Sequence, residues 1–325
     1  MIVIGASAGG VSALSTLAAQ LPANFPAPVL VVLHIGSYHS VLPQILSARG
    51  PLPAAHACHG DRMVGGRIYV APPDRHLLVG DGGQLHLTRG PKEHYTRPSI
   101  DPLFLSAALA YGSRAVGVIL TGTMDDGTAG LQAIKACGGT VVVQDPDNAQ
   151  EPSMPRSALK YVAVDHCGPI DGMAAVLAAM TCRERALALT EQPAHLLHEQ
   201  ALELAWGHAM DHLTAIARPS TFVCPDCSGS LWQLIDTQPV RFRCHTGHAY
   251  TLRTLQHALK ETADEALWTA TRALQEQALL LGAVVAVHQE AGENDQASRV
   301  EQARLALMKQ TKSLRELIER EPEMF

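Results

Sequence analysis

A short apolar run at the start of the chain passes through a glycine-rich turn into a helix-like segment. Met1–Ile4 has the composition of a buried strand, and Val11–Ala18 has the apolar spacing of a helix. The six residues between them, Gly5–Gly10, are glycine, alanine and one serine, and such small residues allow a tight connection. A strand that turns directly into a helix is typical of an α/β fold.

The serine of this turn, Ser7, is a candidate nucleophile. A serine flanked by small residues on a sharp strand-to-helix turn has the form of a nucleophile elbow, and the N–H groups of the following helix favour developing negative charge. Two other interpretations stay open. One is a phosphate-binding turn, although the dinucleotide fingerprint needs glycine where Ser7 stands and the lysine of the other common phosphate loop is missing. The other is a tight turn without chemistry.

Strand-like and helix-like runs continue to alternate as far as residue 180. The β-branched, apolar runs are Val29–Leu33, Val116–Leu120 and Thr140–Val143. Helix-like stretches such as Leu103–Ala110 and Gly130–Ala136 fall between them. This alternation predicts an open, mostly parallel, doubly wound sheet with helices on both faces. Gly65–Val70 and His76–Thr88 are expected to form an inserted hairpin that turns at Asp81-Gly82-Gly83.

Composition narrows the class of protein. The 325 residues are 47% hydrophobic and 17% charged, which is enough for a large core and a second, smaller domain. A net charge of −6 argues against nucleic acid as a partner, and no apolar run approaches the roughly 20 residues needed for membrane insertion. We expect no signal peptide, because the glycine-rich turn interrupts the first apolar run. Seven cysteines, including one C-x-x-C, favour the cytoplasm and a metal over a disulfide framework.

Two further segments could complete a serine hydrolase site, because catalytic residues of open parallel sheets gather at the carboxyl ends of strands. His34 directly follows the run Val29–Leu33 and is a candidate base, although an ordinary core or surface histidine is the alternative. The loop Leu120–Gly127 contains Asp125 and Asp126, either of which could orient the base or simply cap the next helix. The chain order Ser, His, Asp differs from that of α/β-hydrolases, so a triad here implies another fold.

Several ordered segments together resemble a known family. They are Ile4–Gly10, His34, Gly60-Asp61, Tyr69–Leu77, Arg97–Asp101, Leu120–Gly127 and Met154-Pro155. Over residues 1–180 the chain resembles the catalytic domain of the CheB family, the chemotaxis protein-glutamate methylesterases. The resemblance implies that Ser7 is the nucleophile, His34 the base and Asp126 the orienting carboxylate. It also implies hydrolysis of glutamate γ-methyl esters on chemoreceptors, with methanol as product and no cofactor for catalysis.

The chain departs from the family pattern near the expected oxyanion site. Ala8 stands where the family often has threonine, and the loop sequence is Thr-Gly-Thr-Met-Asp-Asp-Gly in place of Thr-Gly-Met-Gly-x-Asp-Gly. We therefore expect the backbone at Ala8 and near Thr123 to stabilise the oxyanion. Arg97 is either a substrate-cleft residue or an ordinary surface arginine. These departures keep open a non-catalytic signalling scaffold with the same fold. The turn that carries Ser7 is equally compatible with an esterase for another acyl substrate.

Regulation is a further point of difference from the family. Its regulated members carry an N-terminal phospho-receiver domain, and we expect control without one here. The Cys/His segment and the C-terminal helices are the candidates to replace control by a receiver domain.

A Cys/His segment lies outside the family resemblance. Cys224-Pro-Asp-Cys227 is followed after sixteen residues by Cys244-His-Thr-Gly-His248, a spacing that predicts a zinc ribbon or finger. We assign Cys224, Cys227, Cys244 and His248 as ligands, because His245 directly follows Cys244 and fits a tetrahedron poorly. Four protein ligands favour a structural zinc over a catalytic one. A metal-free fold or a redox-active cysteine pair is the alternative.

The predicted domain organisation has four parts. They are a catalytic domain over 1–180, a helical linker over 181–221, a zinc-ribbon-like segment over 222–251 and a helical hairpin over 252–325. The hairpin is expected to break near Gly292–Asp295, and its apolar residues recur at helical spacing: Leu255, Leu259, Leu267, Leu274, Leu281, Val300, Leu307, Leu314 and Leu317. They predict either an antiparallel helical hairpin that packs on its own domain or a coiled coil that binds a protein partner or dimerises.

Overall fold

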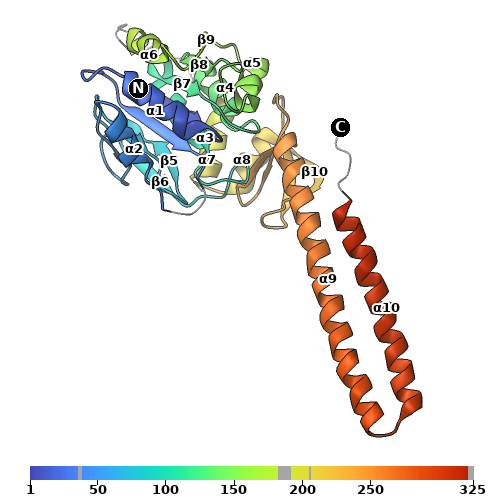
Figure 1. Ribbon diagram of the computed structural model, residues 1–325. Coiled ribbons are helices and arrows are strands. Elements are labelled where there is room, and N and C mark those ends of the chain that lie inside the picture. Colours follow the sequence, from blue (N-terminus) through green and yellow to red (C-terminus); the bar gives the residue numbers. More distant parts are fainter. Residues whose placement is uncertain (36–38, 182–191, 205, 321–325) are drawn as a thin grey trace. The chain divides into compact units, whose positions relative to one another are not determined.

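A computed structural model of the chain describes residues 1–35, 39–181, 192–204 and 206–320 (Figure 1). The chain forms two compact units, Met1–Leu255 and Gln256–Phe325. All candidate catalytic and metal-binding residues named above lie in the first unit.

A seven-stranded parallel sheet is the centre of the first unit. Its spatial order is β3 (Ala54–His56), β4 (Ile68–Val70), β2 (Val29–Leu33), β1 (Ile2–Ala6), β7 (Val116–Ile119), β8 (Thr140–Gln144) and β9 (His166–Gly168). Every strand runs parallel to its neighbours, which confirms the predicted sheet. Because β1 lies between β2 and β7, the loops that follow these three strands meet at one edge of the sheet.

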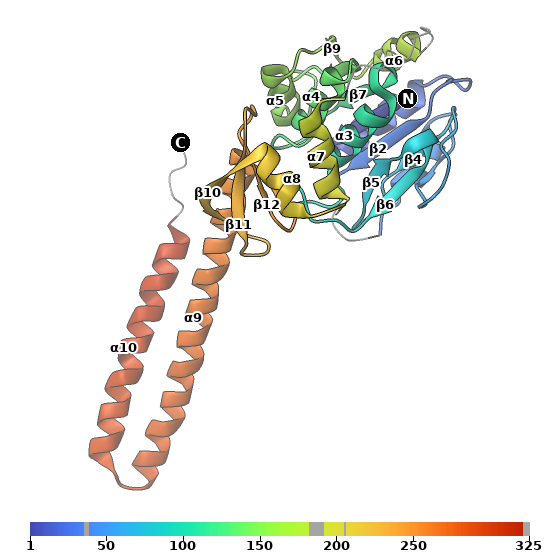
Figure 2. The ribbon, with the colours of Figure 1, turned by 180° about the vertical axis from the view of Figure 1, so that it is seen from behind.

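Helices cover both faces of this sheet (Figure 2). On one face, α1 (Gly10–Gln20), α2 (Leu42–Arg49) and α6 (Met173–Thr181) form a core with Ile2 and Ile4 of β1. On the other face, α3 (Ile100–Tyr111), α4 (Thr128–Ala136) and α5 (Ser153–Tyr161) form a second core with Val3 of the same strand. Successive side chains of a strand point to opposite faces, so one apolar strand contributes to both cores. This confirms the doubly wound architecture.

The inserted hairpin is shorter than predicted. It consists of β5 (His76–Val79) and β6 (Leu85–Thr88), which pair antiparallel around a short 3-10 turn at Asp81–Gly83. The expectation that Gly65–Val70 belongs to this hairpin is wrong. Its strand β4 pairs parallel with β2 and β3 in the main sheet, because Ile68 and Val70 enter one core and Tyr69 enters the other.

A smaller antiparallel sheet follows two short helices. The helices are α7 (Ala194–Glu203) and α8 (Ala209–Ile216), and the four strands in spatial order are β10 (Ala217–Val223), β11 (Ser230–Leu234), β12 (Arg241–Cys244) and β13 (Ala249–Thr251). The predicted linker over 181–221 thus contains both helices and the first residues of β10. Its residues 182–191 lie outside the described part of the chain, and the predicted domain boundaries stay predictions.

Two long antiparallel helices, α9 (Leu252–Glu290) and α10 (Asn294–Glu319), form the described part of the second unit, except that α9 begins within the first unit (Figures 1 and 2). The chain turns between residues 290 and 294, close to the predicted break. Buried positions recur every seven residues at Thr271, Ala278 and Val285. Leu259 and Leu317 were expected to belong to the apolar seam, but their exposed fractions are 38% and 54%. In the described residues, no helix is both long and apolar enough to cross a membrane.

Candidate active site

The turn that carries Ser7 has the tight geometry expected from its small residues. The Ser7 N–H donates to the carbonyl of Thr121 at 3.0 Å, and the Ser7 carbonyl accepts from the N–H of Gly10 at 2.8 Å. Gly9 has a φ of 76°, a left-handed conformation that glycine adopts without steric cost. Ser7 is thereby placed between the end of β1 and the start of α1, as predicted.

His34 and Asp126 meet Ser7 at the carboxyl edge of the sheet. His34 Nδ1 lies 3.2 Å from Ser7 Oγ, and His34 Nε2 lies 2.7 Å from Asp126 Oδ2. Because a carboxylate can only accept, Nε2 carries the proton toward Asp126, and Nδ1 is left to accept the Ser7 hydroxyl proton. The three predicted residues come from the loops after β1, β2 and β7, and the order of these strands brings them together.

Three other groups hold the Asp126 carboxylate, whose side chain is buried. Oδ2 accepts from Ser99 Oγ at 2.8 Å and from the Ile100 N–H at 2.7 Å, and Oδ1 accepts from the Asp101 N–H at 3.1 Å. The two N–H groups belong to the first turn of α3, so the positive end of that helix faces the carboxylate. Burial by itself would raise the pKa of Asp126, but the charge of His94 and the hydrogen bonds from His34 and Ile100 outweigh it and lower the pKa. Asp126 is therefore an anion.

A second buried histidine lies behind this carboxylate. His94 Nε2 is 2.7 Å from Asp101 Oδ2 and 3.6 Å from Asp126 Oδ1, and all three residues are buried. Burial would lower the pKa of His94, but the two carboxylates outweigh burial and raise it to about 10. Ser99 and Asp101 fall in the Arg97–Asp101 segment singled out in the sequence, whereas no pattern in the sequence pointed to His94.

The two aspartates of the loop after β7 have different surroundings. Asp126 contacts His34, whereas Asp125 Oδ1 accepts a hydrogen bond from Thr251 Oγ1 of β13 at 3.0 Å. The alternative that either aspartate caps the next helix is wrong. Helix α4 begins at Thr128 after Gly127, and no side-chain hydrogen bond caps it.

A cleft of about 1110 Å³ opens beside the Ser7 hydroxyl. Its described walls are α1, the end of α2 and Gln150, with Ser7 and His34 in the lining. The proposed oxyanion residues Ala8 and Thr123 are exposed at this edge of the sheet, so the core does not enclose them. A protein segment could approach Ser7 along this cleft.

Arg97 has partners of its own within the protein. Its guanidinium donates to Asp74 Oδ1 at 2.7 Å and to the carbonyls of Gly90 at 2.7 Å and Arg89 at 3.3 Å. These contacts join the segment before α3 to the residues just before β5 and just after β6. A role for Arg97 in the substrate cleft stays a prediction.

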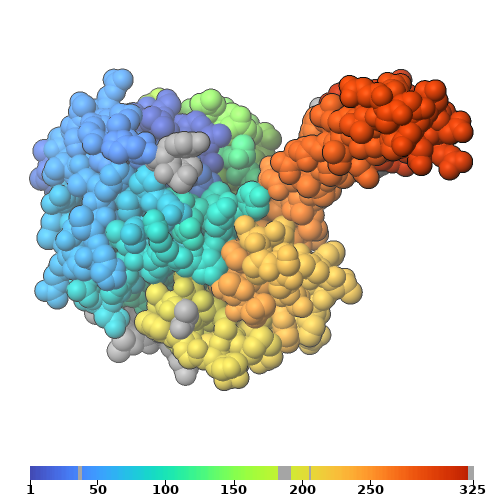
Figure 3. All heavy atoms as spheres, turned by 90° about the horizontal axis from the view of Figure 1, so that it is seen from below, coloured from blue at the N-terminus to red at the C-terminus, as the bar shows by residue number. Residues whose placement is uncertain are grey.

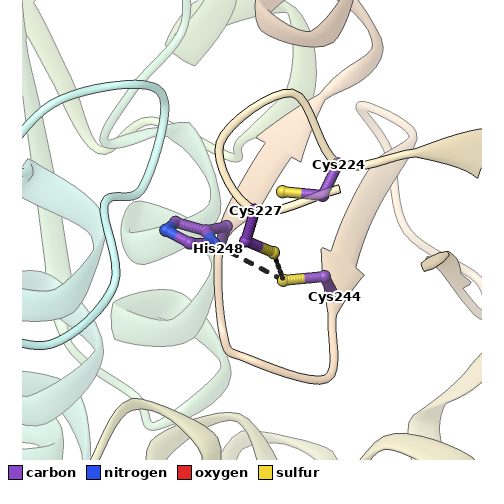
Figure 4. Close-up of side chains that lie close together, drawn as sticks. All are labelled: Cys224, Cys227, Cys244 and His248. Carbon is purple, nitrogen blue, oxygen red and sulfur yellow. Dashed lines mark hydrogen bonds between the residues drawn. The ribbon is translucent and has the colours of Figure 1, made fainter. Parts of the chain in front are cut away.

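The Cys/His residues form a compact cluster (Figure 4). Cys224 and Cys227 lie on the turn after β10, Cys244 ends β12, and His248 directly precedes β13. One possible ligand atom from each of the four lies within 4.8 Å of the others. The sulfurs of Cys227 and Cys244 are 3.7 Å apart, and His248 Nδ1 is 3.6 Å from the Cys244 sulfur. Three thiols and one imidazole at this spacing could bind a metal.

An open parallel sheet with a hydrogen-bonded Ser–His–Asp set at its carboxyl edge places the chain among α/β proteins with a serine-hydrolase type of site. Comparison with known proteins makes the assignment specific. The family model described as CheB methylesterase matches residues 2–177, and the chain belongs to this family. The resemblance inferred from the sequence is confirmed.

Individual relatives agree with this assignment. A protein-glutamate methylesterase/protein-glutamine glutaminase 2 of Anaeromyxobacter dehalogenans is 41% identical over 182 residues, which are 56% of this chain and 53% of the relative. A protein-glutamate methylesterase/protein-glutamine glutaminase 4 of Geobacter metallireducens is 38% identical, over 55% of this chain and 52% of the relative. The chain thus spans about half the length of these curated relatives. The solved CheB methylesterase catalytic domain of Thermotoga maritima is 33% identical, with a TM-score of 0.53 over 55% of this chain and 97% of that domain.

Proposed function

We propose that this protein is a serine hydrolase that removes the γ-methyl ester from glutamate side chains of chemoreceptors and releases methanol. The observation that carries the proposal is the hydrogen-bonded set Ser7, His34 and Asp126 in a domain of the CheB methylesterase family. The cleft beside Ser7 supports a substrate presented by a protein segment. We place the reaction in the cytoplasm, where cysteines remain reduced.

The proposed reaction has two symmetrical halves. His34 Nδ1 takes the Ser7 proton while Oγ attacks the ester carbonyl, and Asp126 stabilises the imidazolium that forms. The tetrahedral intermediate then expels the methoxy group, which takes the proton from His34 and leaves as methanol. Water repeats the attack on the acyl-enzyme, with His34 again as base, and releases the glutamate. The same steps would release ammonia from a glutamine side chain, the second activity in the names of the relatives.

Backbone donors are the proposed oxyanion stabilisers. The Ala8 N–H lies on the turn just before α1, and a second donor is expected near Thr123. Loss of one such donor typically slows an acyl transfer by about 100- to 1000-fold. Because backbone groups supply both contacts, alanine at position 8 is compatible with activity.

A structural zinc is the proposed occupant of the Cys/His cluster. The donor set fits this ion: three sulfurs and one imidazole nitrogen, from two turns, lie within 4.8 Å of one another. Four protein ligands leave no position for substrate, so the ion would supply fold stability and no chemistry at Ser7. The ligands Cys224, Cys227, Cys244 and His248 would then join the turn after β10 to the turn between β12 and β13.

Methanol release from methylated chemoreceptor tests the proposed activity. We expect release by the full-length protein and a loss of at least about 1000-fold in Ser7→Ala, because the nucleophile is gone while the buried strand β1 is unchanged. Ser298→Ala, at an exposed serine of α10, is the matched control and should retain the wild-type rate. Equal release by wild type and Ser7→Ala would exclude the proposed nucleophile. A folded wild type with no release would favour the scaffold or another acyl substrate.

A further inference from the structure

The four-stranded sheet packs against the segment that carries His94. Figure 3 shows the gold part of the chain, which contains this sheet, in direct contact with the teal part that precedes and includes α3. The backbone N–H of His94 donates to the Ala249 carbonyl of β13 at 2.8 Å. Glu93 and Ala249 form an isolated parallel β-bridge. Next to this bridge, the buried guanidinium of Arg243 pairs with the Glu93 carboxylate. Strand β13 therefore holds the backbone of His94.

The backbone of this segment is strained. His94 has a φ of 51° and Tyr95 a φ of 67°, so two successive residues with side chains adopt the left-handed conformation. Such residues persist only where surrounding contacts hold them, and they are concentrated at functional sites. Here the surrounding contacts come from β13, a strand far away in the sequence.

Carboxylates surround the His94 imidazole. Nε2 faces Asp101 of α3 and Asp126 of the loop after β7, and Asp125 of that loop adds a third acidic group. From α9, the Thr254 hydroxyl lies 3.5 Å from Nδ1. Acidic groups this close to a buried histidine favour its charged form, and the charge of His94 in turn lowers the pKa of Asp126.

We propose that His94 is a positioning residue for the reaction at Ser7. As an imidazolium it binds Asp101 and lies against Asp126, so that it keeps the carboxylate anionic and turned toward His34. The four-stranded sheet keeps His94 in this place. The catalytic centre therefore extends beyond the 2–177 region matched by the family model and depends on residues of β12 and β13. This inference rests on the proposed methylesterase function.

Kinetics of His94→Asn in the full-length protein test the proposal. Asparagine tolerates the left-handed backbone and keeps a donor, but it has no charge. We expect kcat to fall by about 10- to 100-fold, as for a misplaced catalytic group, with KM changed by less than about twofold. Loss of the buried cation leaves the acidic groups around the site less compensated, so the pH of half-maximal kcat/KM should rise. His56→Asn, at a half-buried histidine of β3, is the matched control and should change neither value.

The outcomes distinguish a positioning role of His94 from a purely structural one. A serine-reactive probe counts the folded molecules, so that kcat can be given per folded molecule. If His94 has only a structural role, this kcat stays at the wild-type value and the pH profile of kcat/KM does not move. That result would overturn the proposal. Ser7→Ala in the same assay tests the proposed function independently. If the His94→Asn protein fails to fold, the ¹⁵N chemical shifts of the His94 imidazole in the wild type test whether the ring is charged. Protonation of both ring nitrogens at about pH 8 is expected, and a neutral ring at that pH would overturn the proposal.

Discussion

At the residue scale, the interior behind Ser7 holds ionisable side chains that are all matched to partners. Asp126 accepts hydrogen bonds from His34, Ser99 and two backbone N–H groups, and Asp101 accepts from His94 and from the Gly130 N–H at 2.6 Å. A buried charge is costly unless it is paired and hydrogen-bonded, so removal of one member leaves the others without compensation. The carboxylate that orients His34 is thus held by the whole set.

The raised pKa of His94 makes a prediction about stability. A histidine whose pKa rises from 6.5 to about 10 on folding stabilises the protein fully below pH 6.5, and this contribution is lost as pH rises toward 10. Between about pH 7 and 9.5 the free energy of unfolding should fall by about 3 kcal/mol more in the wild type than in His94→Asn. Urea denaturation at the two pH values measures this difference. Parallel decreases in both proteins would show that His94 is uncharged in the folded state.

At the element scale, ion pairs join the small sheet to α7 and to the segment before α3. The Arg241 guanidinium of β12 makes two hydrogen bonds, 2.7 and 2.8 Å long, to the Glu199 carboxylate of α7. Arg243 of the same strand is 2% exposed and contacts Glu93 and, at 3.9 Å, Glu203. Burial and the nearby Glu93 raise the pKa of Glu203. The strand is thereby joined to both α7 and the segment that precedes α3.

Replacement of Arg243 should destabilise the protein strongly. Arg243→Met retains most of the side-chain volume but leaves the Glu93 carboxylate buried without its cation, a change that typically costs about 3–5 kcal/mol. Chemical denaturation measures the loss, and Arg218→Met on the exposed part of β10 is the control, with an expected change below about 0.5 kcal/mol. The double variant with Glu93→Gln should recover part of the stability. An unchanged free energy of unfolding in Arg243→Met would show that the Arg243–Glu93 ion pair does not stabilise the packing of the sheet.

The Cys/His turns carry a prediction about metal content. We expect one zinc per chain by elemental analysis, loss of that zinc in Cys244→Ser, and a lower thermal unfolding midpoint, because a structural zinc contributes directly to folding. Cys58→Ser, at an exposed cysteine outside the cluster, should change neither property. Zinc-free protein combined with an unaltered midpoint in Cys244→Ser would favour a metal-free fold.

At the scale of the whole molecule, the two units should be separable in function. The two large cores of the first unit are formed by residues between Met1 and Leu196, whereas α9 and α10 bury residues such as Ala278 and Val285 within the second unit. A chain that ends at residue 265 retains the first unit and the start of α9. We expect it to release methanol within about twofold of the full-length rate, because no residue of the triad or its supports is removed. A large loss of activity would assign the hairpin a role in catalysis.

Exposed apolar side chains on the hairpin bear on the predicted protein partner. Leu279, Leu280 and Val287 of α9 have exposed fractions of 76%, 64% and 64%. The sequence pattern predicted either an antiparallel hairpin packed on its own domain or a coiled coil that binds a partner or dimerises. Both alternatives stay predictions. The seam at Thr271, Ala278 and Val285 uses smaller side chains than the predicted leucines.

Local sequence patterns were sufficient to predict several elements of the fold. Apolar β-branched runs predicted strands, the glycine-rich turn placed Ser7, and family-like motifs singled out Ser7, His34 and Asp126 as candidate catalytic residues. Parallel-sheet topology explains why these three residues lie within hydrogen-bonding distance, because residues that follow adjacent strands meet at one edge. The spacing of cysteines and histidine likewise predicted a cluster, since two close pairs on tight turns need only one contact to come together.

Packing between distant segments sets which side chains face each other across large separations in sequence. The contact of Asp125 with Thr251 depends on β13, and the position of β4 depends on two cores. The part proposed for His94 depends on Asp101, Asp126 and β13. None of these follows from a local pattern, because the partners of a buried side chain are set by packing between distant segments. The sequence therefore determined the candidate catalytic residues, and the fold determined which residues support them.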